Sequence, residues 1–178
     1  LKAWEGAGYY SRARRLHALS QRVMSPASEG GYDGRLPSTY DELLSLPGIG
    51  PYTAAAVASI AFGQPVACVD GNIRRVMARQ TADLDPTPKA VQAWADASLV
   101  GVRPGDWNQA LMELGATVCT PKRAGCVRCP VAASCGGRAT PELFPQPKSQ
   151  RVKTVEMTAI VDHDGQGRPV LVQRPSSG

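Results

Sequence analysis

Four cysteines within a span of seventeen residues give the strongest chemical signal in the sequence. Six, two and five residues separate Cys119, Cys126, Cys129 and Cys135. The short Cys-x2-Cys turn brings two sulfurs to one side, and two outer thiols can close a four-sulfur shell around a metal centre. No apolar leader segment is visible, so we expect metal binding rather than a disulfide framework.

Four thiolates suit either a structural zinc ion or a [4Fe–4S] cluster. Zinc ribbons usually pair two short Cys-x2-4-Cys knuckles, and this sequence contains a single one. The uneven spacing therefore favours a [4Fe–4S] cluster. The fifth cysteine, Cys68, lies in the apolar stretch 65–69 and is predicted to be an ordinary core residue.

A glycine-containing turn is the second feature that could do chemistry. Leu46–Pro51 reads Leu-Pro-Gly-Ile-Gly-Pro and lies between two predicted helices. Gly48 and Gly50 permit a tight turn and the close approach of another backbone. Amides at the start of the next helix can point at a phosphate, which would clamp a nucleic-acid backbone around Ile49 without reading its sequence. An ordinary turn between helices also favours Pro and Gly, so the pattern alone leaves both interpretations open.

Asp70 stands directly before a predicted helix, in the segment Val69-Asp70-Gly71-Asn72. The common role for such an aspartate is a helix N-cap. The alternative is a catalytic carboxylate at the mouth of a cleft. The pattern by itself does not separate these two roles.

Helices are the elements that must position these residues. Apolar spacing and capping residues predict helices over 10–24, over 53–62, after Asp70, after Thr87, and from a cap at Asp106 toward Cys119. No segment before Cys135 has a strand pattern, so we predict an all-α domain over residues 1–137. We predict a Pro-rich linker over 138–153, and a second domain that opens with a β-hairpin in residues 154–178.

The composition fits a globular protein. Of 178 residues, 43% are hydrophobic and 20% charged, which excludes collagen, coiled coil and wholesale disorder. No apolar run is long enough to cross a bilayer. The net charge of +5 is a mild bias toward polyanions such as nucleic acid. We expect a protein of the bacterial cytoplasm, associated with the nucleoid.

Leu46–Gly50, Val69–Asn72 and the cysteine spacing, in this order, resemble the helix–hairpin–helix DNA glycosylases that carry an iron–sulfur cluster. Gly6–Arg14 and Asn108–Gly115 are similar to the adenine-specific branch, the MutY-type adenine DNA glycosylases. The resemblance covers nearly the whole chain. It implies a monomer that repairs double-stranded DNA by removing adenine opposite 8-oxoguanine or guanine.

The resemblance also implies roles for individual residues. Asp70 would stabilise the cationic sugar, and Asn72 would position Asp70 or the sugar. Tyr52 would line the same pocket, where bifunctional relatives of the endonuclease III kind carry a Schiff-base lysine, so strand cleavage is not expected. Glu113 would contact the flipped base. Lys122 and Arg123, with the hairpin residues, would bind phosphates, and the four cysteines would hold the [4Fe–4S] cluster.

The sequence departs from the family in one respect. The family uses a glutamate on an earlier helix to protonate the leaving adenine, and we find no equivalent, since Glu5 lies in a different motif. The absent initiator methionine indicates an incomplete or processed N-terminus, and we expect these residues alone to be impaired as an enzyme. Residues 154–178 would begin the family's Nudix-like C-terminal domain.

Two alternative functions remain open from the sequence. One is an endonuclease III-like glycosylase and lyase that acts on oxidised pyrimidines. The other is a non-catalytic DNA-binding module whose cysteines hold zinc.

Overall fold

The computed structural model of the chain describes residues 2–147, 154–156 and 161–170. The α-helices are α1 (Tyr10–Met24), α2 (Tyr40–Leu44), α3 (Pro51–Phe62), α4 (Gly71–Thr81), α5 (Pro88–Ser98) and α6 (Pro104–Glu113). A π-helical turn, η3 (Leu114–Val118), continues α6. The 3-10 turns are η1 (Lys2–Trp4), η2 (Ala27–Glu29), η4 (Cys126–Arg128), η5 (Ala132–Ser134) and η6 (Pro141–Leu143). These described residues form no β-strand, which confirms the prediction of a helical domain.

Capping residues fix several of the helix boundaries. The Thr39 hydroxyl accepts a hydrogen bond from the Glu42 amide at the start of α2, and the Thr87 hydroxyl does the same for the Ala90 amide in α5. Gly63 ends α3 in the left-handed conformation, with a φ of 66°. Each device satisfies a backbone group that a helix end leaves without a partner, or turns the chain away from the helix axis.

The expected cap of α6 at Asp106 is wrong. The helix begins at Pro104, and Arg103, three residues before Asp106, occupies the N-cap position. Proline suits the first helical position because its missing N–H would have no partner there. Asp106 instead lies in the first turn, where its carboxylate pairs with the Arg103 guanidinium.

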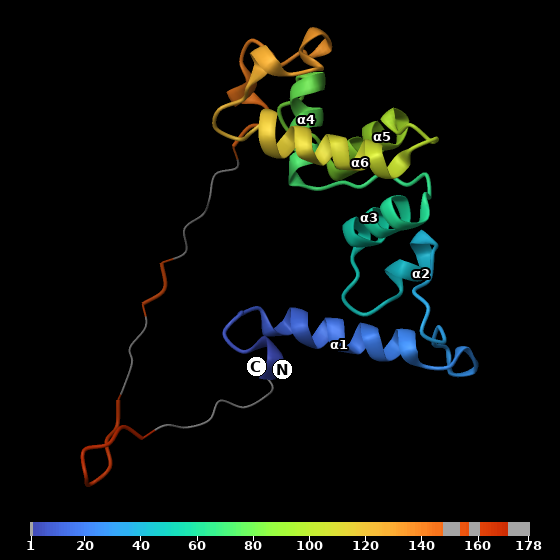
Figure 1. Cartoon of the computed structure of the whole chain (residues 1–178). Coiled ribbons are helices and arrows are strands. Elements are labelled where there is room, and N and C mark those ends of the chain that lie inside the picture. The colour runs from blue at the N-terminus through green and yellow to red at the C-terminus, as the bar shows by residue number, and fades with distance from the viewer. Residues whose placement is uncertain (1, 148–153, 157–160, 171–178) are drawn as a thin grey trace. The chain divides into compact units, whose positions relative to one another are not determined.

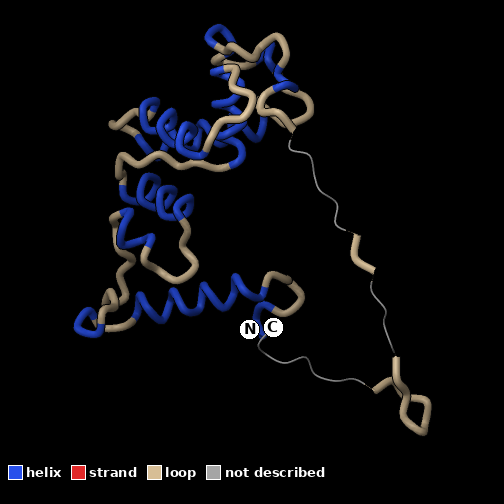
Figure 2. The backbone as a smooth tube through the Cα atoms, turned by 180° about the vertical axis from the view of Figure 1, so that it is seen from behind, coloured by secondary structure: helices blue, strands red, loops and turns tan. Residues whose placement is uncertain are grey.

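Two apolar clusters hold the helical unit Leu1–Pro147 together. One lies under α3, α4 and α5 and is built from Ala55, Cys68, Ile73, Met77 and Val91. The other joins α2 and α3 to the inner side of α1, where Leu19 and Val23 pack against it. Figure 1 shows α4, α5 and α6 grouped together, with the cysteine-containing segment at one end of the group, and Figure 2 shows the same grouping from behind.

The second compact unit is Lys148–Gly178. Its described residues contain one isolated antiparallel bridge, between His163 and Pro169, across a turn stabilised by Asp164. The β-hairpin predicted in residues 154–178 lies partly outside the described residues. Among the residues described in either unit, no helix is long and apolar enough to cross a membrane.

Candidate functional site: a hairpin, a capping carboxylate and a cysteine loop

The hairpin Leu46–Pro51 connects α2 to α3 and exposes the start of α3. Gly48 has a φ of 80°, a conformation that side chains other than glycine rarely adopt. Gly50 is the N-cap of α3, has no side chain to bond the first amides, and is followed by Pro51. The first turn of α3 therefore keeps N–H groups available for an external acceptor such as a phosphate oxygen.

Helix α1 lies directly against this hairpin. A Cβ built on Gly48 would meet the Cβ of Arg15 at 2.6 Å. Glycine at this position is thus required twice, by the backbone angle and by the approach of α1. Arg12 and Arg15 of α1 line a groove together with Pro47, Gly48 and Ile49 of the hairpin.

Asp70 is the N-cap of α4, as the simpler interpretation of the sequence held. Its Oδ1 accepts a hydrogen bond from the Ile73 amide at 2.8 Å. Its Oδ2 accepts a second bond from Nδ2 of Asn72 at 2.9 Å. These two hydrogen bonds hold the carboxylate in one orientation. Because the residue is half-buried, part of it still faces solvent. Capping and a chemical role are therefore compatible in the same side chain.

Asn72 connects this carboxylate to the cysteine segment through Arg75. Nη2 of Arg75 donates to Oδ1 of Asn72 at 2.9 Å and to the carbonyl of Gly115 at 2.7 Å. Nε of Arg75 donates to the carbonyl of Cys119 at 2.8 Å. Burial, and next the positive charge of Arg79, lower the pKa of Arg75 from its ordinary value.

Tyr52 lies in the first turn of α3 and connects this helix to α6. Its hydroxyl donates to the sulfur of Met112 at 3.0 Å, which ties the start of α3 to α6. Burial raises the pKa of Tyr52, and the negative charge of Asp70 raises it further, so the two side chains are electrostatic neighbours. Glu113 is exposed at the end of α6, next in sequence to Met112.

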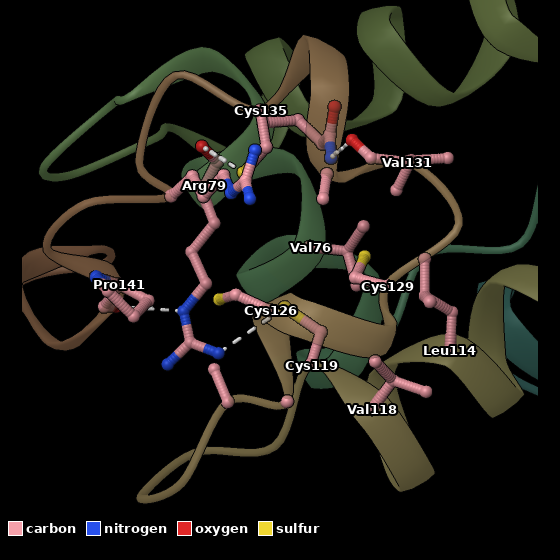
Figure 3. Close-up of a pocket in the computed structure, with 15 residues that line it drawn as sticks. Val76, Arg79, Leu114, Val118, Cys119, Cys126, Cys129, Val131, Cys135 and Pro141 are labelled. Atoms are coloured by element: carbon pink, nitrogen blue, oxygen red, sulfur yellow. Dashed lines mark hydrogen bonds between the residues drawn. The ribbon is translucent and has the colours of Figure 1, made fainter.

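The four clustered cysteines line one cavity, together with apolar side chains such as Val76 and Leu114. Figure 3 shows all four around this space, with Arg79 beside them. Burial raises the pKa of Cys135; a hydrogen bond with the Gly137 backbone opposes this increase, and negative charge on the other three sulfurs adds to it. Among the described residues, no group of three or more His, Cys, Asp or Glu side chains could hold a metal ion. Lys122 and Arg123 are exposed in the loop between the first two cysteines.

Arg79 is a site residue that the sequence analysis missed. It is buried, with 3% of its surface exposed, and extends from α4 into the cysteine segment. Its Nη1 donates to the sulfur of Cys119 at 3.3 Å. Its guanidinium also donates to backbone carbonyls within the cysteine segment, those of Thr120 and Pro121, and after it, those of Pro141 and Phe144. The available signal was its position three residues after Val76, on the buried face of α4.

Gly115 is a second missed residue. It lies in the π-helical turn η3 and is buried against Asn72. A π-helical turn is rare and often occurs at functional sites, but its position is not marked by the apolar spacing of α6. The amino acid at this position gave no signal beyond the segment Asn108–Gly115 in which it occurs.

Comparison with known proteins agrees with this arrangement. The helix–hairpin–helix motif family matches residues 31–60, which span α2, the hairpin and most of α3. The chain is 49% identical over 140 residues to the human adenine DNA glycosylase, a match that covers 76% of this chain and 25% of the human protein. The chain thus spans about a quarter of the length of that relative.

Solved structures show the same fold at lower identity. A thermostable thymine-DNA glycosylase matches with a TM-score of 0.63 and 33% identity, covering 72% of this chain and 59% of that one. A non-covalent endonuclease III–DNA complex matches with a TM-score of 0.62 and 27% identity, covering 74% of this chain and 60% of the other. The hairpin, the fold and the higher identity to the adenine enzyme together make this chain a homologue of the MutY-type adenine DNA glycosylases.

Proposed function

We propose that the protein removes adenine opposite 8-oxoguanine or guanine in double-stranded DNA, by hydrolysing the N-glycosidic bond without cutting the strand. The observation that carries the proposal is the carboxylate of Asp70, which hydrogen bonds from the Ile73 amide and the Asn72 side chain hold in one orientation at the start of α4. The homology to adenine DNA glycosylases supports the choice of base.

The hairpin supplies the grip on DNA. The uncapped first turn of α3 presents N–H groups to a phosphate, and Gly50 leaves the approach to them open. Contacts to phosphates position a duplex without reading its sequence. An enzyme that acts on a base must extrude it from the stack. Unstacking and unpairing the base costs a few kcal/mol, and binding of the adjoining backbone offsets this cost. In this proposal Lys122 and Arg123, both exposed, add phosphate contacts.

Asp70 would act on the sugar. Departure of adenine builds positive charge on the deoxyribose, and a fixed carboxylate near the anomeric carbon stabilises that charge. At about 4 Å and an effective dielectric constant of about 20, such a pair is worth about 4 kcal/mol, or about a thousandfold in rate. Asn72 fixes the orientation of Asp70, and Glu113 is proposed to contact the extruded base.

Tyr52 distinguishes this proposal from a glycosylase with lyase activity. A lyase forms a Schiff base between an amine and the sugar, and a phenol cannot form an imine. A phenol is protonated at neutral pH, and burial raises the pKa of Tyr52 further, so its hydroxyl stays a hydrogen-bond donor. Borohydride reduction should therefore give no covalent protein–DNA adduct, and an abundant adduct would favour the endonuclease III-like alternative.

The cysteine segment fits a [4Fe–4S] cluster held by Cys119, Cys126, Cys129 and Cys135. Around a zinc ion, all four sulfurs must lie about 2.3 Å from one point, whereas each thiolate of a cluster binds its own iron. Four thiols that surround a cavity without forming a single-ion site are compatible with the second arrangement. The cluster when bound cross-links the segment, and Arg79 would hold that segment against α4.

Binding to a transition-state mimic tests the role of Asp70 without requiring turnover. The wild-type chain and Asp70→Asn are compared on duplexes with 8-oxoguanine opposite a cationic pyrrolidine in place of the deoxyribose, or opposite a neutral tetrahydrofuran analogue. We expect Asp70→Asn to weaken binding to the cationic duplex at least tenfold and to leave the neutral duplex within about twofold. Equal losses on both duplexes would reduce Asp70 to a helix cap and favour a non-catalytic DNA-binding module.

A further inference from the structure

We infer that Asn108 is a positioning residue for Asp70, because its side-chain amide fixes the chain segment that leads to this carboxylate. The inference rests on the proposed function for the role of the carboxylate. Its test includes a measurement that requires no DNA.

The segment in question is the connection between α3 and α4, residues 63–70. It forms neither a helix nor a strand, so its backbone lacks the regular hydrogen bonds that such elements supply. Ala67 and Cys68 are nevertheless buried, with 2% and 0% of their surface exposed. A buried backbone needs hydrogen-bond partners, and here side chains must provide them.

Asn108 of α6 provides two of these partners with one amide group. Its Oδ1 accepts a hydrogen bond from the Cys68 amide at 3.0 Å, and its Nδ2 donates to the Val66 carbonyl at 2.9 Å. These are the two groups on either side of Ala67 that a neighbouring parallel strand would bond. Nε2 of Gln92 in α5 adds a longer bond, of 3.4 Å, to the carbonyl of Ala67. Asn108 thus replaces a missing strand, a role that needs a donor and an acceptor in one planar group.

Asn108 is itself held in place. It is fully buried, and its Nδ2 also donates to the Ser59 hydroxyl at 2.9 Å, which in turn donates to the Ala55 carbonyl of α3 at 2.8 Å. The start of α6 lies so close to α3 that a Cβ on Gly105 would come within 2.8 Å of the Ser59 carbonyl oxygen. A buried polar network whose members all have partners favours a single arrangement.

This network determines where α4 begins. Val69 alone separates the anchored Cys68 from Asp70. Hydrogen bonds at the start of α4 orient the carboxylate relative to that helix, whereas Asn108 fixes the start of the helix relative to α3 and α6. Because α3 also carries the proposed phosphate grip, Asn108 controls the distance between that grip and the carboxylate.

The paired sugar analogues measure the position of the carboxylate. We propose to compare the wild-type chain with Asn108→Ala on duplexes with 8-oxoguanine opposite the cationic pyrrolidine or the neutral tetrahydrofuran analogue. A charge pair that opens from about 4 Å to about 5 Å, at an effective dielectric constant of about 20, loses about fourfold in affinity. We therefore expect the preference of Asn108→Ala for the cationic duplex to fall about fourfold or more.

Hydrogen exchange reports on the backbone directly. The amides of residues 68–73 should exchange about tenfold faster in Asn108→Ala, beyond any change shared with the amides of α5, because each lost hydrogen bond contributes about that factor. Asn108→Ser is the second variant, for the case in which Asn108→Ala does not fold. Its hydroxyl can bond a water molecule in the vacated space but is too short to replace the amide, so the same losses are expected.

Ser59→Ala is the matched control. It removes another buried partner of Asn108 and should also destabilise the fold, but the bonds from Asn108 to Val66 and Cys68 remain. We expect its preference for the cationic duplex to stay within about twofold of the wild type, as for a site that is not coupled to the carboxylate.

A preference that survives in the Asn108 variants, or that falls equally in Ser59→Ala, would overturn the inference and leave the proposed role of Asp70 intact. A wild-type chain that binds both duplexes equally would instead defeat the proposed function. Hydrogen exchange then decides the inference. Faster exchange confined to residues 68–73 in the Asn108 variants would support it, and faster exchange spread evenly over the helical unit would overturn it.

Discussion

The backbone of Gly115 lies against the side chain of Asn72, so closely that a Cβ at position 115 would come within 2.7 Å of the Asn72 Cβ. The same glycine accepts a hydrogen bond through its carbonyl from Arg75, which also holds Asn72. Asn72 in turn donates to the carboxylate of Asp70. The π-helical turn therefore determines the position of the Asp70 carboxylate through Asn72.

Gly115→Ala should displace Asn72 and thereby Asp70. Overpacking of this kind costs about 1–3 kcal/mol, and a melting temperature lower by several degrees is expected. We also expect weaker binding to the cationic sugar analogue than to the neutral one, because the carboxylate has moved. Gly101→Ala is the matched control, since a Cβ there meets nothing within 4 Å. Equal loss for both analogues would limit Gly115 to a packing role.

Asn72→Ala removes one of the two hydrogen bonds to Asp70 and leaves the amide of Ile73 in place. A bond to a charged group is worth about 1.5–3 kcal/mol, so we expect the preference for the cationic over the neutral analogue to fall about tenfold or more. Because the Ile73 cap survives, helix α4 should keep its amide protection in hydrogen exchange. Loss of that protection at the start of α4 would show that Asn72 is needed for folding of the helix itself.

Arg79→Met removes the donors that hold the cysteine segment while retaining an unbranched side chain. Four backbone carbonyls and the sulfur of Cys119 would lose a partner, and each buried unsatisfied group costs about 1–3 kcal/mol. We expect a loss of at least about 3 kcal/mol in the free energy of unfolding, and faster hydrogen exchange over residues 119–144.

Arg74→Met provides the comparison for Arg79. Arg74 pairs with the exposed Asp85, and a pair of this kind is worth less than about 1 kcal/mol. Similar destabilisation by both substitutions would contradict the special role given to Arg79. Visible absorbance of the purified variants reports separately whether the cysteines still hold iron.

Cys68 should be inert in the folded protein. It is fully buried, and burial raises the pKa of its thiol, with a further increase from the charge of Asp70. The folded state therefore disfavours the thiolate. The contribution of this thiol to the free energy of unfolding is fully present below its unfolded pKa and is lost as the pH rises from there through its higher folded pKa. Alkylation at about pH 8, followed by mass spectrometry, should modify Cys68 only after denaturant is added. Modification at the rate of a free cysteine would contradict this burial.

The two hairpin glycines should respond differently to alanine. Gly48→Ala places a Cβ 2.6 Å from that of Arg15 and in a left-handed conformation, so we expect a loss of at least about 1 kcal/mol in stability. Gly50→Ala meets nothing within 4 Å and keeps an allowed backbone, so its cost should stay below about 1 kcal/mol. Binding to duplex DNA should nevertheless weaken for Gly50→Ala, because the methyl group obstructs the first turn of α3. Unchanged DNA affinity would place the phosphate elsewhere.

Local patterns were sufficient for much of the helical unit. The helix over 10–24 was predicted from apolar spacing, and Thr87 with Pro88 marked the start of α5 correctly. These features depend on groups a few residues apart, which a linear sequence displays directly. Asp106 was misassigned because it satisfies the composition rule for a cap, while Pro104 decides where the helix begins.

Contacts between distant residues could not be predicted in the same way. Arg79 meets carbonyls more than forty residues further along the chain, and Arg75 joins Asn72 to Gly115. Apart from the position of Arg79 three residues after Val76, nothing near either arginine in sequence distinguishes it from an exposed helical arginine. The roles of the half-buried Arg75 and the buried Arg79, unlike the cysteine spacing, become recognisable only when α4, η3 and the cysteine segment are placed together.

The different surroundings of Gly48 and Gly50 affect how a glycine motif should be interpreted. Gly48 is required by its close contact with α1. A homologue that no longer bound nucleic acid would still need glycine at this position in order to fold. A Cβ at Gly50 would meet no neighbour among the described residues, so packing within this part of the chain does not require glycine there. Glycine at the position of Gly50 is therefore the better indicator that a related protein still binds nucleic acid.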